Sequence, residues 1–364
     1  MEKIFSMALV ALLGMALAAC GGNSGNGGNT GNTGGGASAD TGNTGQAGSS
    51  KEASSVTLRL STPDPDTASI TVAARELAKV VEQKSGGTIK IEVFPNGTLY
   101  GADPSAAVKQ LGAGSLDMLA LSTSLYANFV PKFSMVSVPY LFDDSEQLMD
   151  YFNGEPGQEL LMSLDELGIQ GAGIWTRNFR QITNSKRPIE KPADLSGLRM
   201  RVPNNPLWVE YFKAAGSVPT PMAFGEVYNA LQLKTIDGQE NPVEVPVNNK
   251  FYEVQKYLTM SNHMADGWVV ALNKAKFDKL SAEQQRIITE AVKEMQAWSA
   301  DKDKQDESSY IKQLEDNGMA VNELTPEQRD AFIEISKGLY PKFKELVKDD
   351  AFFDTSLQFV GKAE

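Results

Sequence analysis

Short strand patterns and helix patterns alternate along the first half of the sequence, and this alternation constrains the fold more than any other feature. The segments TLRL (57–60), TIKIEVF (88–94) and LDMLAL (116–121) have the residue patterns of strands. Helical patterns lie between them, from about 67 to 84 and from about 103 to 111. Strands separated by helices predict an α/β lobe, which binds ligands beyond the carboxyl ends of its strands.

A second group of strand patterns lies further along the chain. Its segments are IQGAGIW (169–175), QIT (181–183), RMRV (199–202), SVPTPM (217–222) and GWVVALNK (267–274). The body after about residue 54 is too long for one comfortable core, which indicates two lobes. We expect more than one crossing between them, with lobe 1 formed by 54–177 and 267–305 and lobe 2 formed by 178–266 and 306–364.

The C-terminal third of the chain is mostly helical in pattern. Ser281 with Gln284 and Thr325 with Gln328 match the capping box that starts a helix. The helix that follows Ser281 is long, and we expect it to span both lobes. The prediction is therefore an α/β, two-lobed fold with mixed sheets and hinge strands between the lobes.

The N-terminus has the pattern of an export signal. Lys3 precedes an apolar run from 4 to 17, and small residues then lead to Cys20, an arrangement that resembles a bacterial lipobox. We predict a lipoprotein signal peptide at 1–19, lipidation of Cys20, and a flexible Gly/Asn/Ser/Thr tether over 20–53. The protein would then be extracytoplasmic and lipid-anchored to the cell envelope. An anchor helix with an incidental cysteine is the alternative.

Composition and residue counts argue against several classes of function. The formal net charge of −12 argues against nucleic-acid binding, which needs a basic face. The single cysteine excludes a disulfide within the chain, and the single histidine, His263, disfavours a zinc site or a histidine-dependent catalytic site. The acidic and basic residues of DKDKQDE (301–307) indicate a solvated helix face. We therefore expect a binding protein, not an enzyme, with no cofactor and no metal ion.

Four segments together form a sequence pattern that is specific to one protein family. They are RPIEKPADLSGLRMRVP (187–203), PTPMAFGEVYNALQ (219–232), DGQENP (237–242) and FYEVQKYLTMSNH (251–263). The sequence resembles the DctP-type solute-binding receptors of TRAP transporters, and the looser pattern extends over nearly the whole body. This resemblance implies a two-lobed flytrap that closes on a small organic acid. It also implies delivery of the acid to a membrane permease driven by an ion gradient, with the receptor expected to be a monomer.

The resemblance also implies a set of ligand-binding residues. Arg201 matches the arginine that grips the ligand carboxylate, and a guanidinium suits that role because it makes two parallel charge-assisted hydrogen bonds. Arg180 matches a second cationic position near the acid group. Asn204 and Asn241 match polar contacts, and Phe224 matches an aromatic ring that covers the apolar part of the ligand.

Further site residues are predicted around these. Trp175 ends its strand and is a candidate pocket wall, while the loop Thr62-Pro63-Asp64 is expected to face the cleft. Receptors for sialic acid carry a glutamate in the segment where this chain has Leu121, Ser122, Thr123 and Ser124. Its absence disfavours sialic acid. Ser122 and Ser124 suit a second carboxylate or a hydroxyl group of a compact acid.

Each assignment has an alternative. Arg201 could form a structural ion pair, and Arg199, on the same face of the strand, has no ligand role in the family. Asn241 precedes Pro242 and could serve only to turn the chain. Phe224 could pack between the lobes. At the level of the whole protein, the alternatives are a receptor for a sensory system and an exported organic-acid enzyme.

Overall fold

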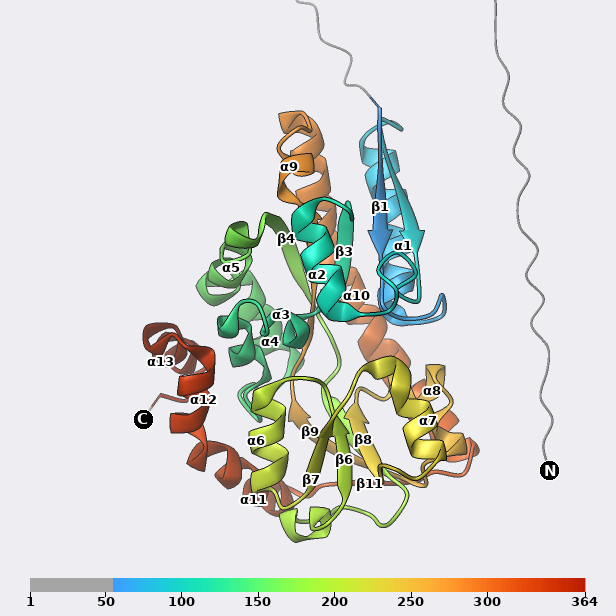
Figure 1. Cartoon of the computed structure of the whole chain (residues 1–364), viewed down its shortest axis with the longest axis vertical. Coiled ribbons are helices and arrows are strands. Elements are labelled where there is room, and N and C mark those ends of the chain that lie inside the picture. Colours follow the sequence, from blue (N-terminus) through green and yellow to red (C-terminus); the bar gives the residue numbers. More distant parts are fainter. Residues whose placement is uncertain (1–54, 364) are drawn as a thin grey trace, which may run out of the picture. The chain divides into compact units, whose positions relative to one another are not determined.

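The computed structural model describes residues 55–363. The described chain contains two mixed sheets with helices packed on them, so the predicted α/β class with mixed sheets is confirmed (Figure 1). The signal peptide, Cys20 and the tether, all predicted from the sequence, lie outside the described residues.

The first sheet has the strand order β2-β1-β3-β10-β4. Its strands are β1 (Val56–Ser61), β2 (Ile89–Phe94), β3 (Met118–Ser122), β4 (Ile169–Thr176) and β10 (Gly267–Asn273). β1 is parallel to β2 and β3, whereas β10 is antiparallel to β3 and β4. All residues of β3 and β10 are buried, as expected for strands covered on both faces.

The second sheet has the order β11-β9-β5-β8-β6-β7. Its strands are β5 (Arg180–Asn184), β6 (Arg199–Val202), β7 (Val218–Pro221), β8 (Gly238–Asn241), β9 (Tyr257–Met264) and β11 (Ala320–Glu323). β6 is parallel to β7 and β8, and β5 is antiparallel to β8 and β9. We refer to the parts built on the first and second sheets as lobe 1 and lobe 2.

The helices connect and cover the strands. They are α1 (Ser69–Lys84), α2 (Pro104–Ala113), α3 (Thr123–Tyr126), α4 (Ser145–Asn153), α5 (Glu155–Met162), α6 (Pro206–Ala214), α7 (Val227–Gln232), α8 (Glu244–Asn248), α9 (Lys274–Phe277), α10 (Ala282–Asp316), α11 (Pro326–Gly338), α12 (Tyr340–Val347) and α13 (Asp350–Phe359). The apolar stripe predicted for α1, which includes Ile70, Leu77 and Val81, is buried on the first sheet.

α10 connects the two lobes. Its start is fixed by the capping box expected at Ser281, whose Oγ accepts from Gln284 N (3.2 Å) while Gln284 Oε1 accepts from Ser281 N (3.0 Å). The helix has 35 residues, and Ile287, Ala291 and Met295 in its first half are buried in the core of lobe 1. Its second half packs near α8 and β11 of lobe 2 (Figure 1). The predicted long helix spanning both lobes is present.

The C-terminal helices differ from the predicted lobe boundaries, which placed all of 306–364 in lobe 2. α11 packs on α6 of lobe 2, but α13 packs on α5, beside the sheet of lobe 1. Tyr151 of α4 joins Ser356 by a hydroxyl hydrogen bond (2.8 Å), and its ring lies 5.7 Å from that of Phe359, centroid to centroid. The apolar side of α13 is therefore buried against the α4–α5 pair, so the chain ends on lobe 1.

Candidate functional site

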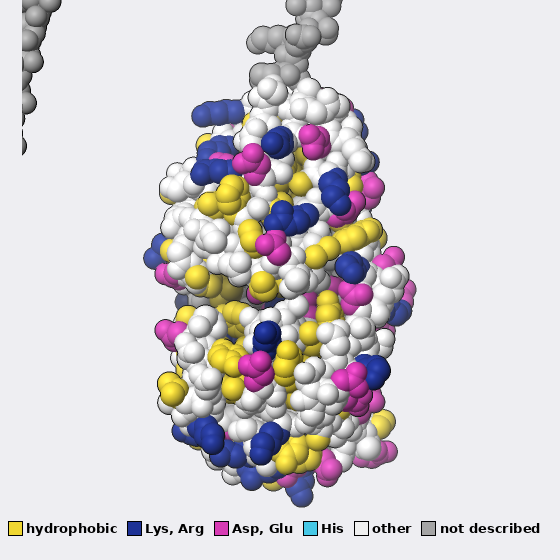
Figure 2. Space-filling model, turned by 90° about the vertical axis from the view of Figure 1, so that its right-hand side faces the viewer, with side chains coloured by type: hydrophobic (Ala, Val, Ile, Leu, Met, Phe, Trp, Pro, Cys, Tyr) yellow, Lys and Arg dark blue, Asp and Glu magenta, His cyan; other side chains and the backbone are white. Residues whose placement is uncertain are grey.

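A cavity lies between the two lobes. It is next to the segments in which the chain passes from one sheet to the other, between β4 and β5 and between β9 and β10. Its volume is about 130 Å³. The surface is hollowed between the lobes (Figure 2). The lining includes seven of the eight predicted ligand residues, which are Ser122, Ser124, Arg180, Arg201, Asn204, Phe224 and Asn241.

Arg201 reaches the cavity from β6 and is only 4% exposed. Its Nε and Nη2 donate to Met222 O at 3.2 and 2.9 Å, and its guanidinium lies 5.8 Å from the ring centroid of Phe224. No carboxylate between residues 55 and 363 forms an ion pair with it. Burial, which Glu240 only partly offsets and Arg180 reinforces, lowers the pKa of Arg201 to about 10. Arg201 is therefore a buried cation whose charge is not matched.

Arg199, two residues earlier on the same strand, has a different environment. Its Nε and Nη2 each donate to a carboxylate oxygen of Asp237 at 2.9 Å, and Nη2 also donates to Lys234 O at 2.8 Å. Arg199 does not line the cavity. Of the two arginines in RMRV, Arg199 forms a structural ion pair with Asp237, whereas Arg201 lines the cavity.

Arg180 begins β5 and is 3% exposed. Its Nε and Nη2 donate to the two carboxylate oxygens of Glu240 at 2.5 and 2.8 Å, and its Nη1 donates to Asp266 at 3.2 Å. The charge of Arg180 is thus already compensated by protein carboxylates, unlike that of Arg201.

Glu240 also binds the only histidine of the sequence. Burial acts to raise the pKa of Glu240, but the charge of Arg180 and hydrogen bonds from His263 and Arg180 outweigh it, and its pKa is about 2. Burial lowers the pKa of His263, with Glu240 acting in the opposite direction. Since Glu240 is ionised at neutral pH, His263 Nε2 is the donor in the 3.2 Å hydrogen bond between them. Hydrogen bonds thus link Arg180, Glu240 and His263 into one buried network beside the cavity.

Hydroxyl groups at the junction of β3 and α3 interact with Asp266. Ser122 Oγ lies 2.8 Å from both carboxylate oxygens of Asp266 and 2.6 Å from Ser124 Oγ. Thr123 donates to the same carboxylate at 2.7 Å. Asp266, fully buried at the crossing between β9 and β10, therefore joins the hydroxyls of Ser122 and Thr123 to Arg180.

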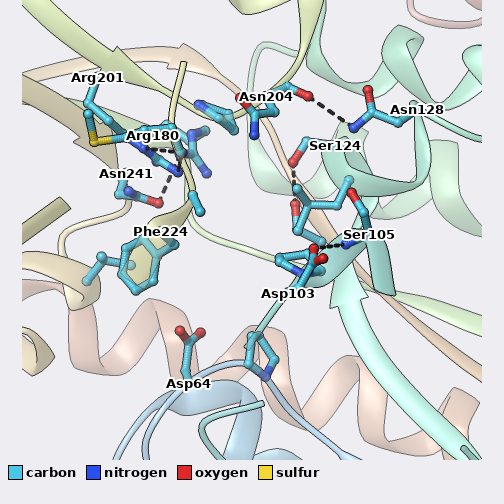
Figure 3. A pocket seen from close by; sticks show the side chains of 18 of the residues that line it. Asp64, Asp103, Ser105, Ser124, Asn128, Arg180, Arg201, Asn204, Phe224 and Asn241 are labelled. Carbon is cyan, nitrogen blue, oxygen red and sulfur yellow. Dashed lines mark hydrogen bonds between the residues drawn. The ribbon is translucent and has the colours of Figure 1, made fainter. Parts of the chain in front are cut away.

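The two predicted asparagines lie at the cavity in different ways. Asn241, at the end of β8, is buried; its Oδ1 accepts from Arg180 (2.9 Å) and its Nδ2 donates to Gln239 (2.7 Å). Asn204 is exposed, and its backbone oxygen accepts from Asn128 Nδ2 at 3.0 Å. Figure 3 shows Arg180, Arg201 and Asn241 together on one side of the cavity.

Trp175 is not part of the cavity wall, so that prediction is corrected. It is fully buried in the core of lobe 1, and its indole nitrogen donates to Val292 O of α10 at 2.8 Å. Trp268, its register partner on β10, lines the cavity instead. The guanidinium of Arg177 lies 4.3 Å from the centroid of the Trp268 ring, and Arg177 also donates to Asp266 at 3.2 Å.

Asp64 is a buried carboxylate on the lobe 1 side of the cavity. It is 8% exposed, and its carboxylate makes no hydrogen bond or ion pair within the described residues. Burial raises its pKa to about 6, with Arg177 opposing and Glu244 adding to the rise. The sequence placed the loop of Asp64 at the cleft, but it gave no sign that the carboxylate would be unpaired.

Sequence reasoning missed Arg177, Asp266 and Asn205. Asn205 Oδ1 caps α6 by accepting from Leu207 N (2.9 Å), and its Nδ2 donates across the cleft to Ser124 O (3.0 Å). Its position directly before Pro206 is the signal of an N-cap that could have identified it. Arg177 and Asp266 lie in hinge segments, and no local sequence pattern marks them.

No helix between 55 and 363 has the length and apolar character needed to cross a membrane. The same residues contain no group of three or more histidine, cysteine, aspartate or glutamate side chains placed to hold a metal ion.

Sequence comparisons place the chain among binding proteins. A family model described as bacterial extracellular solute-binding protein, family 7 (DctP), matches residues 60–346. The 2,3-diketo-L-gulonate-binding periplasmic protein YiaO of Escherichia coli is 32% identical over 78% of this chain and 85% of its own length. The C4-dicarboxylate-binding periplasmic protein DctP of Rhodobacter capsulatus is 33% identical over 75% of this chain and 82% of its own.

A solved structure agrees with these sequence matches. The sugar acid binding protein DctPAm of Advenella mimigardefordensis, in complex with galactonate, has a TM-score of 0.81 and 32% identity. The match covers 86% of this chain and 100% of that one. The predicted two-lobed binding-protein fold is therefore confirmed. The chain belongs to family 7 of the bacterial extracellular solute-binding proteins, the DctP family of TRAP-type receptors.

Proposed function

We propose that this protein is the receptor of a TRAP transporter and that Arg201 binds the carboxylate of a small organic acid in the cleft. The observation that carries this proposal is the unmatched charge of Arg201, 4% exposed at a cavity of about 130 Å³. A buried charge is costly unless an opposite charge and hydrogen bonds compensate it. A ligand carboxylate supplies both, because it is planar and accepts two parallel hydrogen bonds from a guanidinium.

The remaining site residues orient Arg201 and the ligand. Arg180, held by Glu240 and Asp266, donates to Asn241 Oδ1 and so fixes the Asn241 side chain at the cavity. The ring of Phe224, beside the guanidinium of Arg201, covers the apolar part of the acid.

Binding couples to the arrangement of the lobes. Arg201 belongs to lobe 2, while Ser122 and Ser124 belong to lobe 1. Hydrogen bonds already join the lobes next to the cavity, from Asn205 to Ser124 O and from Ser69 to Glu244 (2.7 Å). An acid that touches both lobes stabilises the closed arrangement by the difference in its affinity for the closed and open forms. The closed receptor then delivers the acid to a membrane permease, with lipidated Cys20 retaining it at the cell envelope.

A thermal-shift screen tests this proposal. Mono- and dicarboxylates, keto acids and sugar acids are compared with neutral sugars and amines of the same size. At a ligand concentration 100 times Kd, binding stabilises the folded state by about 2.7 kcal/mol, which raises Tm by several degrees. We expect acids alone to produce this shift. A shift with neutral sugars and none with any acid contradicts the proposal.

A further inference from the structure

We propose that Asp64 determines specificity by accepting hydrogen bonds from hydroxyl groups on the end of the ligand remote from its carboxylate. The cleft would then select hydroxylated monocarboxylates over dicarboxylates of the same length. This inference rests on the proposed function, because it takes Arg201 as the carboxylate site.

The position of Asp64 is fixed by its backbone. Asp64 lies in the loop between β1 and α1, and its carbonyl oxygen accepts from Asn96 N (3.0 Å) and Thr71 Oγ1 (3.2 Å). Its side chain lines the cavity from lobe 1, away from the arginines of lobe 2 (Figure 3). A carboxylate that is buried, held in place and unpaired has acceptor capacity that only a molecule in the cavity can use.

The charged neighbours of Asp64 leave this capacity in place. Arg177 is the cation that acts on it, but Arg177 already donates to Asp266 (3.2 Å) and lies 3.6 Å from Glu244, nitrogen to oxygen. Glu244 adds negative charge near Asp64. The pKa of the Tyr100 hydroxyl is raised by burial and, to a smaller extent, by the charge of Asp64. Asp103 supplies another carboxylate to the lining from the same lobe.

The two ends of the cavity therefore make different demands. Arg201 requires a negative group, whereas Asp64 requires a hydrogen-bond donor and repels a second anion. A four-carbon hydroxy acid such as D-erythronate meets both demands. Succinate, also with four carbons, places a second carboxylate against Asp64 unless one of the two groups takes up a proton.

Protonation gives the inference a second, independent signature. Because the pKa of Asp64 is about 6, its carboxylate is mostly ionised at pH 8 and mostly neutral at pH 5. Hydroxyl donors bind the ionised form, so affinity for erythronate falls as the pH falls. Succinate follows the opposite trend, since neutral Asp64 can donate to its second carboxylate.

The test is isothermal titration calorimetry at pH 8 and pH 5 with a panel of hydroxylated monocarboxylates (D-erythronate, galactonate) and the dicarboxylate succinate. Wild type is compared with Asp64→Asn, Asp66→Asn and Arg201→Gln. Asp66, two residues away, is exposed and paired with Arg75, so Asp66→Asn is the matched control.

We expect Asp64→Asn to weaken hydroxy-acid binding about tenfold or more at pH 8 and to strengthen or preserve succinate binding. Asp66→Asn should change neither. An unchanged ratio of hydroxy-acid to succinate affinity in Asp64→Asn overturns the inference, as does a wild-type preference for succinate at pH 8. If the inference about Asp64 is overturned but Arg201→Gln binds none of the acids that wild type binds, the proposed function stands. If wild type binds no acid, the inference and the proposed function both fail.

Discussion

Arg201 and Asp64 line one cavity from opposite lobes with opposite charges, and neither side chain has an ion-pair partner among residues 55–363. Arg180, which is also buried at the cleft, is by contrast paired with Glu240 and Asp266. A buried charge without a partner is costly. We therefore propose that the ligand compensates both charges.

The ligand-free protein should be more stable when Asp64 is neutral. Its pKa is about 6 in the folded state against 3.8 in the unfolded chain, so ionisation costs folding roughly 3 kcal/mol. The cost is absent below pH 3.8 and complete above pH 6. Asp64→Asn should therefore raise the unfolding free energy at pH 8 by about 2–3 kcal/mol, with no gain at pH 4, measured by urea denaturation. Equal effects at both pH values would show that Asp64 is not buried in its charged form.

Replacing Glu240 should have the opposite effect. Glu240→Gln leaves Arg180 with Asp266 as its remaining carboxylate, and removal of one partner of a buried pair costs about 3–5 kcal/mol. Because the pKa of Glu240 is about 2, below 4.5, its stabilisation is present above pH 4.5 and is lost as the pH falls toward 2. Urea denaturation at pH 7 and pH 3 should show the difference between variant and wild type shrinking at the lower pH.

An exposed ion pair provides the control for Glu240. Glu290 of α10 pairs with Arg286 at 2.8 Å, with both side chains more than half exposed (53% and 55%). Glu290→Gln should change the unfolding free energy by no more than about 0.5 kcal/mol. A loss as large as that of Glu240→Gln would indicate a general effect of net charge on the fold.

Salt should weaken acid binding only modestly. The Debye length is about 10 Å at 0.1 M salt, but screening acts weakly on charges that are removed from water. Arg201 is 4% exposed, so we expect the Kd for the preferred acid to rise less than about threefold between 0.1 and 0.5 M NaCl. A steep, power-law increase measured by calorimetry would instead indicate an open, hydrated anion patch.

The sequence predicted the strand with two arginines but not the environment of each arginine. The period-2 pattern of RMRV puts Arg199 and Arg201 on one face, and nothing local distinguishes them. The difference comes from Asp237, a partner 38 residues from Arg199 that neutralises only the first arginine. Resemblance to the family, more than pattern, pointed to Arg201.

Other misses have the same physical origin. Trp175 lies at the end of its strand, where cavity residues are often found. Its indole nitrogen instead donates to Val292 O, 117 residues away, on a helix whose packing the sequence pattern does not predict. Asp266 is a single acid in a short turn, and its partners come from the β3–α3 junction and the β4–β5 hinge. The sequence predicts that the C-terminal third is helical, as α13 is. It does not predict which lobe α13 packs on, because that depends on contacts with Tyr151, which is distant in the sequence.

The central claim is that Arg201, and not Arg199, binds the ligand carboxylate. Calorimetric titration of the preferred acid into Arg201→Gln and Arg199→Gln tests it most directly, since the two residues lie on one strand and only Arg199 is paired with Asp237. We expect Arg201→Gln to lose about 2–4 kcal/mol of binding free energy, roughly 30- to 1,000-fold in Kd, and Arg199→Gln to remain within about threefold of wild type. Wild-type affinity in Arg201→Gln, with the fold intact by circular dichroism, would contradict the account.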